Sequence, residues 1–204
     1  MIDLLREALL RRPLPGVEAQ LSLAHVDRKI EAFAEAPREA GVLILLFPRE
    51  GELYFPLIQR TSHNPNDRHR GQIGLPGGRR ELSDVDIVAT ALREAEEEIG
   101  VDRRLVEVLG ELSPLPVPIS NFMVYPTVGY VDAAPAWVPQ VSEVARVIEA
   151  PLAGLLAEGA VRRGEVRAPG GLTLKQVPYF DLAGEVVWGA TSMVLSELRQ
   201  VLGG

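Results

Sequence analysis

One short segment carries an unusual load of acidic side chains. Residues 93–98 read REAEEE, and the apolar residues around them recur at three- and four-residue steps, which is typical of a helix with one buried face. On such a helix Glu94, Glu97 and Glu98 stand at positions i, i+3 and i+4, so their carboxylates share another face. Three carboxylates this close repel one another unless a positive charge lies among them. A hard divalent cation that prefers oxygen ligands, Mg²⁺ or Mn²⁺, is the natural neutraliser.

The alternative for this segment is an exposed helix face rich in glutamate, which is common in soluble proteins. Such a face usually interleaves charges of both signs, whereas here four glutamates accompany a single arginine. Arg93 lies one helical turn before Glu97 and could hold a carboxylate in place. The charge pattern therefore favours a site that binds a cation.

The residues around the helix fit this reading. Ser83 or Asp84 is suited to cap its first turn, and Gly100 suits the left-handed position after its end. Just upstream, Pro76-Gly77-Gly78 predicts a tight turn whose backbone can approach a ligand closely, because glycine has no Cβ.

Taken together, Gly78 and the stretch Arg93-Glu94-Ala95-Glu96-Glu97-Glu98-Ile99-Gly100-Val101 resemble the Nudix box. The second half of that motif, Arg-Glu-apolar-x-Glu-Glu-x-Gly-apolar, is matched at every fixed position. The first half departs from the motif, because the sixth residue after Gly78 is Asp84 instead of Glu and the gap to Arg93 is one residue longer. Asp84 and Asp86 are both candidates for the early acidic position.

This resemblance implies a metal-dependent diphosphatase in which water attacks a nucleoside diphosphate linked to a second group. It implies Glu94, Glu97 and Glu98 as ligands of Mg²⁺ or Mn²⁺, with Arg93 orienting them. A carboxylate must also take the proton of the attacking water. Glu98 is one candidate, and Glu143 is the other, because several family members carry a base on a loop after the box. For Glu143 the alternative is an ordinary surface glutamate before a strand.

A second resemblance narrows the substrate. Gly71-Gln72-Ile73-Gly74-Leu75-Pro76-Gly77-Gly78 is similar to the stretch that precedes the box in Nudix hydrolases of coenzyme A, with Leu75 where Phe is usual. Residues 57–62 resemble the start of that stretch, and the long form of the box also looks like this subfamily. The arginine expected before the first glycine falls on Asp67, so Arg68 or Arg70 would have to replace it. The resemblance implies coenzyme A or a derivative as substrate, cut into 3′,5′-ADP and 4′-phosphopantetheine.

The segment 60–80 is locally basic, although the chain as a whole is acidic. A diphosphate and the 3′-phosphate of coenzyme A would both suit such a segment. An ordinary solvated loop is the alternative for Arg68 and for Arg70. The residues expected to bind substrate are Arg60, Arg68, Arg70, Gly77, Gly78 and Arg79.

Other substrates and one other class of protein stay open at this point. ADP-ribose, a reduced nicotinamide dinucleotide, a dinucleoside polyphosphate or a nucleoside triphosphate would also bring phosphates to such a site. A nucleotide sensor that has lost catalysis is the alternative of another class. Sensors of this kind usually have a damaged box, whereas this chain keeps Arg93 and the three glutamates. The intact box favours an enzyme.

Composition limits the class of protein. The chain has 204 residues, of which 47% are hydrophobic and 24% charged, as in soluble globular proteins. A net charge of −7 argues against non-specific binding to nucleic acid. No apolar run is long enough to span a membrane, no secretion signal is evident and there are no cysteines, so we expect a cytoplasmic protein without disulfides.

Hydrophobic periodicity predicts alternating strands and helices, and hence a mixed sheet covered by helices on both faces. The Nudix resemblance implies the same α/β/α sandwich. We expect residues 1–40 to form an N-terminal helical extension and residues 41–204 to form the domain itself. The extension would pack on the domain or against a second copy of the chain, which leaves a homodimer open. The predicted helices are 2–12, 21–36, 151–158 and 189–202; the predicted strands are 41–47, 53–60, 105–112, 121–131, 144–150, 161–168 and 172–180, with a stiff proline-rich loop at 113–120.

Overall fold

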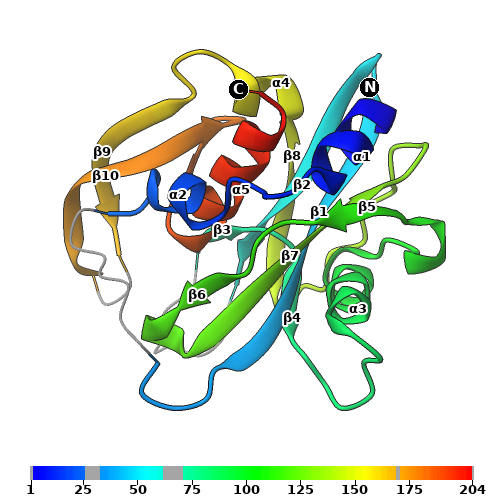
Figure 1. Cartoon of the computed structure of the whole chain (residues 1–204), viewed down its shortest axis with the longest axis horizontal. Helices are drawn as coiled ribbons and strands as arrows, with labels where there is room; N and C mark the ends of the chain where they lie inside the picture. The colour runs from blue at the N-terminus through cyan, green and yellow to red at the C-terminus, as the bar shows by residue number, and fades with distance from the viewer. Residues whose placement is uncertain (1, 26–32, 62–70, 169–170, 204) are drawn as a thin grey trace.

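The computed structural model describes residues 2–25, 33–61, 71–168 and 171–203. A mixed sheet of eight strands lies between two layers of helices, so the expected α/β/α sandwich is confirmed (Figure 1). Helix α3 (Ile87–Ile99) covers one face of the sheet. The opposite face is covered by α1 (Ile2–Leu10), α2 (Gly16–Leu21), α4 (Leu152–Leu156) and α5 (Ala190–Val201).

The strand β1 (Arg38–Arg49) is the centre of the sheet. It runs parallel to β7 (Phe122–Tyr130) along most of its length. On its other side, its first half pairs with β4 (Gly77–Arg79) and its last residues pair with β2 (Glu52–Arg60), both antiparallel. Strand β2 also pairs with β3 (Ile73–Gly74) and β8 (Val144–Pro151), and β7 pairs with β5 (Glu107–Glu111) and β6 (Leu115–Val117), all antiparallel.

The continuous apolar run of β1 reflects burial on both faces, as predicted for residues 41–47. Leu43, Leu45 and Phe47 pack toward α3, whereas Ile44 and Leu46 belong to the core on the other face. All five side chains are fully buried. A strand that is covered on both sides has no position for a polar residue, which explains the lack of alternation.

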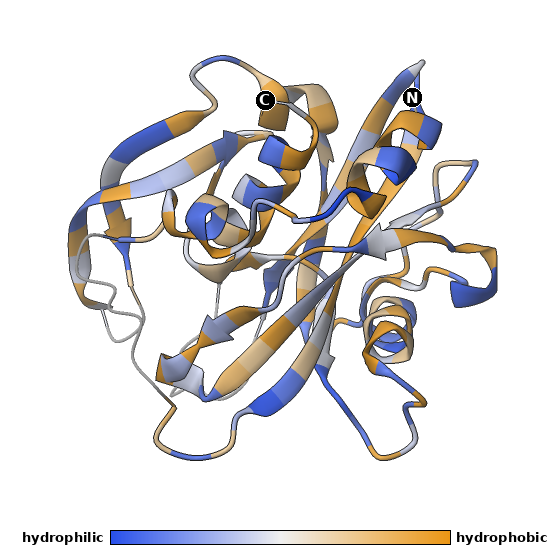
Figure 2. Cartoon of the chain, in the orientation of Figure 1, coloured by the Kyte–Doolittle hydropathy of each residue, from blue (hydrophilic) through white to orange (hydrophobic). Residues whose placement is uncertain are grey.

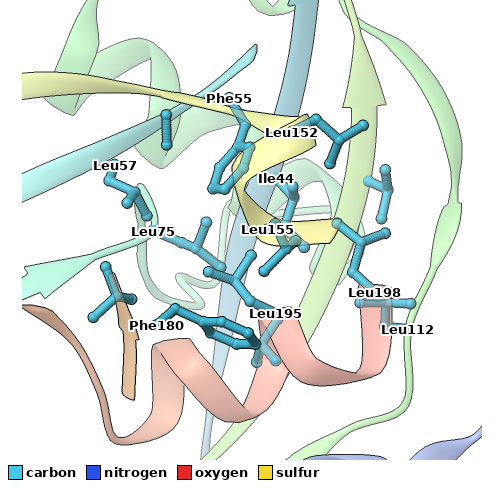
Figure 3. Packing of buried hydrophobic residues seen from close by; sticks show 14 of the residues in the cluster. Ile44, Phe55, Leu57, Leu75, Leu112, Leu152, Leu155, Phe180, Leu195 and Leu198 are labelled. Carbon is cyan, nitrogen blue, oxygen red and sulfur yellow. The ribbon is translucent and has the colours of Figure 1, made fainter. Parts of the chain in front are cut away.

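The larger core lies beneath α4 and α5. Figure 3 shows Phe180 and Leu195 packed near Ile44 and Phe55, which come from the sheet. Helix α5 carries hydrophobic and hydrophilic residues in turn, as an amphipathic helix does (Figure 2). Its predicted inward residues Met193, Leu195 and Leu198 are buried, and Leu202 is half-buried.

A separate three-stranded sheet follows α4. The hairpin predicted at 161–180 is confirmed as β9 (Val161–Arg167) and β10 (Thr173–Leu182). A third strand, β11 (Glu185–Val187), pairs with the end of β10 and was not predicted. Phe180, Leu182 and Val187 reach into the larger core, so this small sheet extends it.

Two sequence predictions are wrong in detail. In place of a helix over 21–36, α2 ends at Leu21, residues 22–25 and 33–36 are not helical, and residues 26–32 lie outside the described residues. A tertiary contact decides this, because the buried carboxylate of Glu197 on α5 accepts hydrogen bonds from the Gly16 backbone (3.1 Å) and from Gln20 Nε2 (2.9 Å). The supposed loop 113–120 contains β6 and a 3₁₀ turn, because proline is tolerated in an edge strand.

Helices α1 and α2 lie on the same face as α5, with Leu5, Leu9 and Leu23 buried in the larger core. The division of the chain at residue 40 stays a prediction. No helix within the described residues is long and apolar enough to cross a membrane.

Gly41 allows α3 to lie directly on β1. A Cβ at this position would come 2.6 Å from the Ile87 carbonyl oxygen and 2.8 Å from the Ala91 nitrogen, both in the helix backbone. Gly41→Ala should therefore push the helix away and lower the free energy of unfolding by about 1–3 kcal/mol, measured by denaturant unfolding. Gly154→Ala is the control, because its Cβ would meet the nearest atom at an ordinary 3.4 Å, and alanine within α4 should not lower stability. Equal stability of Gly41→Ala and the wild type would contradict this account of the packing.

Candidate active site

The acidic helix begins at a different cap from the one predicted. Asp86 is the N-cap of α3, and its carboxylate accepts a hydrogen bond from the Ala89 backbone at 2.7 Å. The prediction of Ser83 or Asp84 is wrong because the Asp84 carboxylate is held by Arg93 instead. Gly100 ends the helix with φ of 75°, as expected for the left-handed position.

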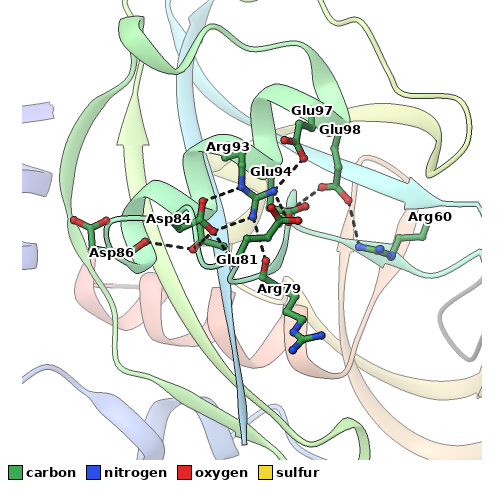
Figure 4. A network of polar contacts seen from close by, with 11 residues as sticks. Arg60, Arg79, Glu81, Asp84, Asp86, Arg93, Glu94, Glu97 and Glu98 are labelled. Carbon is green, nitrogen blue, oxygen red and sulfur yellow. Dashed lines mark hydrogen bonds and ion pairs between the residues drawn. The ribbon is translucent and has the colours of Figure 1, made fainter.

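Arg93 joins three parts of the chain (Figure 4). Its Nε and Nη2 donate to the two oxygens of Asp84 at 2.9 and 3.0 Å, which is a bidentate ion pair. Its Nη1 donates to Glu94 at 2.9 Å and to Glu97 at 3.0 Å. Its Nη2 also donates to the Arg79 carbonyl oxygen at 3.1 Å, which ties the helix to β4. One guanidinium therefore fixes the loop before the helix, the acidic face and the neighbouring strand.

Asp84 is built to stay ionised. Besides the Arg93 ion pair, it accepts hydrogen bonds from the Glu81 backbone and the Thr90 hydroxyl, both at 2.9 Å. The bond from Arg93, followed by these others, holds the pKa of Asp84 well below its usual range despite burial of the side chain. Of the two candidates for the early acidic position of the motif, Asp84 is thus the partner of Arg93 and Asp86 is the cap.

Glu94 lies directly over β4, because Gly77 and Gly78 pair with β1 in place of the tight turn predicted at Pro76-Gly77-Gly78. A Cβ on Gly78 would come closer than 3.0 Å to all three atoms of the Glu94 carboxyl group, so any other residue here would displace that group. Burial raises the pKa of Glu94, and the neighbouring Arg93 opposes that effect. The Gly77–Gly78 backbone therefore approaches the acidic face as closely as the sequence predicts.

Glu98 is the most deeply placed carboxylate of the three, with a side chain only 2% exposed. It accepts a hydrogen bond from the Gly77 backbone at 2.8 Å and lies 3.4 Å from the Arg60 guanidinium. Burial raises the pKa of Glu98 to about 7, although Arg60 and the Gly77 bond both act to lower it. Arg60 and the Gly77 hydrogen bond therefore do not fully offset the cost of burying an ionised Glu98.

Glu97 and Glu143 lie at the open side of this cluster. The Glu97 side chain is 59% exposed and reaches Arg93. Glu143 is exposed at the end of the loop before β8, and its charge raises the pKa of both Glu94 and Glu98. The structure thus brings Glu143 into the neighbourhood of the helix although 45 positions separate it from Glu98 in the chain.

The residues expected to bind substrate are only partly brought together. Arg60 lies beside Glu98, and Gly77 and Gly78 lie under the carboxylates. Arg79 contributes its carbonyl oxygen to Arg93, while its guanidinium points away from the acidic face in Figure 4. Arg68 and Arg70 lie outside the described residues. Sequence reasoning missed Thr90 as a partner of Asp84, and no spacing signal marks it.

The donor set suits a hard cation in its chemistry. All three glutamates offer carboxylate oxygens on adjacent turns, as Mg²⁺ and Mn²⁺ prefer. Within the part of the chain that is described, no three acidic or histidine side chains are grouped to hold an ion as they stand. The reason is visible in the contacts, because Arg93 draws Glu94 and Glu97 to itself while Glu98 turns toward Gly77. The exposed Glu97 has room to reorient, so these residues fit a divalent cation.

Glu98 should make the metal-free protein less stable as the pH rises. In the folded protein its pKa is about 7, whereas an unfolded glutamate titrates near about 4.3. Between these two pKa values Glu98 is ionised in the unfolded chain but still protonated in the folded protein. The free energy of unfolding therefore falls by up to about 1.4 kcal/mol per pH unit over this range, and the effect levels off above the folded pKa. Glu98→Gln should flatten this decline, measured by urea unfolding in EDTA across the range, while the exposed Glu97→Gln should keep the wild-type slope. Identical slopes for wild type and Glu98→Gln would contradict the buried site.

Comparisons with known proteins agree with this arrangement. The NUDIX domain family model matches residues 37–166. A Salmonella paratyphi B protein described as an uncharacterized Nudix hydrolase, NudL, is 34% identical over 168 residues, which cover 81% of this chain and 83% of the relative. Homologous proteins from Salmonella newport and Salmonella heidelberg, under the same description, match to the same extent.

Solved structures show the same fold. The Nudix hydrolase RenU of M. smegmatis superposes with a TM-score of 0.57 at 16% identity, covering 82% of this chain and 86% of that one. A MutT/nudix family protein of Enterococcus faecalis superposes with a TM-score of 0.54 at 17% identity, covering 91% and 79%. Family model, relatives and fold agree with the site, and the chain therefore belongs to the Nudix family of hydrolases, which act on a nucleoside diphosphate linked to a second group.

Proposed function

We propose that this protein hydrolyses the diphosphate of coenzyme A, or of an acyl or oxidised derivative, to 3′,5′-ADP and 4′-phosphopantetheine or its derivative. The observation that carries the substrate is the stretch Gly71–Gly78, which resembles the segment before the box in Nudix hydrolases of coenzyme A. The end of this stretch, Gly77 and Gly78 at the start of β4, lies beneath Glu94 and Glu98. The segment that suggests the substrate thus adjoins the groups proposed to do the chemistry.

We infer that Glu94, Glu97 and Glu98 hold Mg²⁺ or Mn²⁺. When bound, the metal would neutralise charge on the diphosphate and lower the pKa of the attacking water. Arg93 orients two of these ligands. Its bonds to Asp84 and to the Arg79 carbonyl oxygen fix the guanidinium, which in turn donates to Glu94 and Glu97.

Glu143 is the proposed general base. Its charge acts on the pKa of both Glu94 and Glu98, and its side chain is exposed, which supports this role. A water attacks one phosphorus, its proton passes to Glu143, and the phosphorus–oxygen bond of the anhydride breaks, so that one phosphate leaves with the bridging oxygen. Glu98 is the other candidate for the base, but its deep burial and its bond from Gly77 favour a ligand.

Arg60 is proposed to bind the diphosphate. In the structure its side chain is one-third exposed and its guanidinium lies 3.4 Å from Glu98, which is a long contact for an ion pair. A phosphate beside it would offer a stronger charge-assisted bond. Arg68, Arg70 and Arg79 are proposed for the 3′-phosphate on the basis of sequence alone.

The metal assignment predicts a loss of turnover. Glu97→Gln and Glu98→Gln should each lower kcat by orders of magnitude, because each removes one ligand charge while the fold persists. Mn²⁺ should raise the Tm of the wild type through binding to the folded state, and it should raise the Tm of both variants less. Thermal unfolding with and without Mn²⁺ and a phosphate-release assay measure this. Near wild-type turnover of either variant in excess metal would overturn its role as a ligand.

The substrate assignment predicts a preference for the 3′-phosphate. Loss of one charge-assisted contact is worth about 1.5–3 kcal/mol, so dephospho-coenzyme A should have a kcat/KM on the order of ten- to a hundred-fold lower than coenzyme A. Arg68→Ala or Arg70→Ala should shrink that preference while hydrolysis of dephospho-coenzyme A hardly changes. Arg104→Ala is the matched control, because Arg104 is an exposed arginine paired with Asp102 outside the segment 60–80.

A panel of ADP-ribose, a reduced nicotinamide dinucleotide, a dinucleoside polyphosphate and a nucleoside triphosphate completes this experiment. Much faster hydrolysis of any of them than of coenzyme A would replace the proposed substrate. Binding without hydrolysis of every compound, with Mg²⁺ and with Mn²⁺, would indicate the nucleotide sensor instead.

A further inference from the structure

The loop 131–143 joins β7 to β8 and ends with Glu143. Its two ends are bonded to the sheet, since the Val131 nitrogen donates to the Leu46 carbonyl oxygen at 3.0 Å and the Glu143 carbonyl oxygen accepts from the Thr61 nitrogen, next to β2, at 2.8 Å. Between these ends the loop contains neither helix nor strand, so the regular hydrogen bonds of the sheet do not fix its course there. A group that moves a proton must nevertheless be held within a fraction of an ångström of its working position. The structure therefore has to hold this loop by other contacts.

Trp137 is the main side-chain anchor of the loop. Its ring meets the fully buried Phe47 edge-on, with centroids 5.3 Å apart and planes inclined by 71°. It also packs against the cluster of Ile58, Ile99 and Val144, so it lies beneath the last turn of α3. The tryptophan thus contacts β1 and the acidic helix at the same time.

The polar edge of Trp137 is also held. Its indole Nε1 donates a hydrogen bond of 2.6 Å to Glu149 Oε1 on β8. The other oxygen of Glu149 forms an ion pair with Arg49 at the end of β1. A hydrogen bond to a carboxylate has a direction that apolar packing lacks, so it fixes the rotation of the ring as well as its depth.

Backbone hydrogen bonds connect the residues next to Trp137 to the end of α3 and to Glu143. Beside Trp137, the Val138 nitrogen donates to the Ile99 carbonyl oxygen at 3.0 Å, and the Gln140 nitrogen donates to the Glu98 carbonyl oxygen at 2.9 Å. These bonds satisfy two carbonyl groups that the end of a helix leaves without partners. The Gln140 carbonyl oxygen then accepts from the Glu143 nitrogen at 2.9 Å. Glu143 is therefore two backbone hydrogen bonds away from the residue that carries the Glu98 carboxylate.

We propose that Trp137, oriented by Glu149, is a positioning residue that sets Glu143 against the acidic helix for proton transfer. This inference rests on the proposed role of Glu143 as the base. Packing of Trp137 as one more core residue is the competing explanation. It would account for the contact with Phe47 and for a partner of the indole N–H, so the two explanations differ in what they predict for turnover.

Two substitutions remove the hydrogen bond from opposite ends. Trp137→Phe keeps an aromatic ring without the N–H, and Glu149→Met keeps the indole without its acceptor. A displacement of Glu143 by about 1 Å should lower kcat on the order of tenfold to a hundredfold. KM should stay within about twofold, and the Tm rise caused by Mn²⁺ should be unchanged, since neither substitution touches a proposed ligand or a substrate contact.

Two controls separate positioning from packing. Glu149→Gln retains an oxygen acceptor for the indole and should keep wild-type kcat. Tyr54→Leu removes another ring that packs on Phe47, at 6.1 Å between centroids, without touching the loop. It should lower the Tm but leave kcat unchanged. Loss of kcat in Tyr54→Leu equal to that in Trp137→Phe would show that Trp137 acts through general stability, which would overturn the proposal.

The decisive comparison is made in a Glu143→Gln background. If Trp137 acts through Glu143, Trp137→Phe should lower kcat in the wild type and have little further effect in Glu143→Gln. Equal losses in both backgrounds would overturn the positioning role. Wild-type kcat of Glu143→Gln itself would refute the base, whereas a slow Glu143→Gln with a fast Trp137→Phe would refute only the anchor. Should Trp137→Phe fail to fold, Glu149→Met in the same two backgrounds decides the question.

Discussion

The site depends on how one arginine compensates a surplus of negative charge. Arg93 is almost buried, and it is the partner of Asp84, Glu94 and Glu97 at once. Removing one member of a buried ion pair costs about 3–5 kcal/mol, because the partner charge is left without compensation. The bidentate bond to Asp84 uses the Nε edge of the guanidinium, so the Nη1 atom is free to face the helix. The acidic face is therefore organised by a charge whose own position is fixed from the opposite side.

The departure of the chain from the family motif follows from the same contact. Asp is one methylene shorter than the Glu of the usual pattern, so its carboxylate reaches less far from the backbone. Here the loop before the helix is one residue longer and folds back in a turn, with the Asp84 nitrogen bonded to the Glu81 carbonyl oxygen at 3.1 Å. The turn brings the shorter side chain to Arg93, and Asp86 is then available as the helix cap. Loop length and side-chain length thus compensate each other.

Sequence predictions succeeded where an element is determined by residues near it in the chain, and they failed where distant residues determine it. Periodicity identified β1, β2, β7, β8, α3 and α5, because each buries a patterned face that local sequence records. It failed for α2, whose position depends on Glu197, a residue far along the chain. In the site, the spacing of the glutamates predicted their shared face. It could not assign Asp84 and Asp86, because a cap and an ion-pair partner call for the same residue type. The buried position of Glu98 was also beyond prediction, since it arises from β2 and β4 closing over the helix.

Glycine explains why this helix can lie so close to the sheet. Gly41 brings the first turns of α3 onto β1, and Gly78 admits the Glu94 carboxyl group further along the same helix. Gly77 lies against the β1 backbone with φ of 150° and donates its N–H to Glu98. Close approach has an electrostatic consequence, because it excludes water from Glu98 and raises its pKa. A side chain that is costly to ionise in the protein alone gains most from a cation nearby. The same glycines that set the packing distance thus prepare the carboxylates to bind a positive charge.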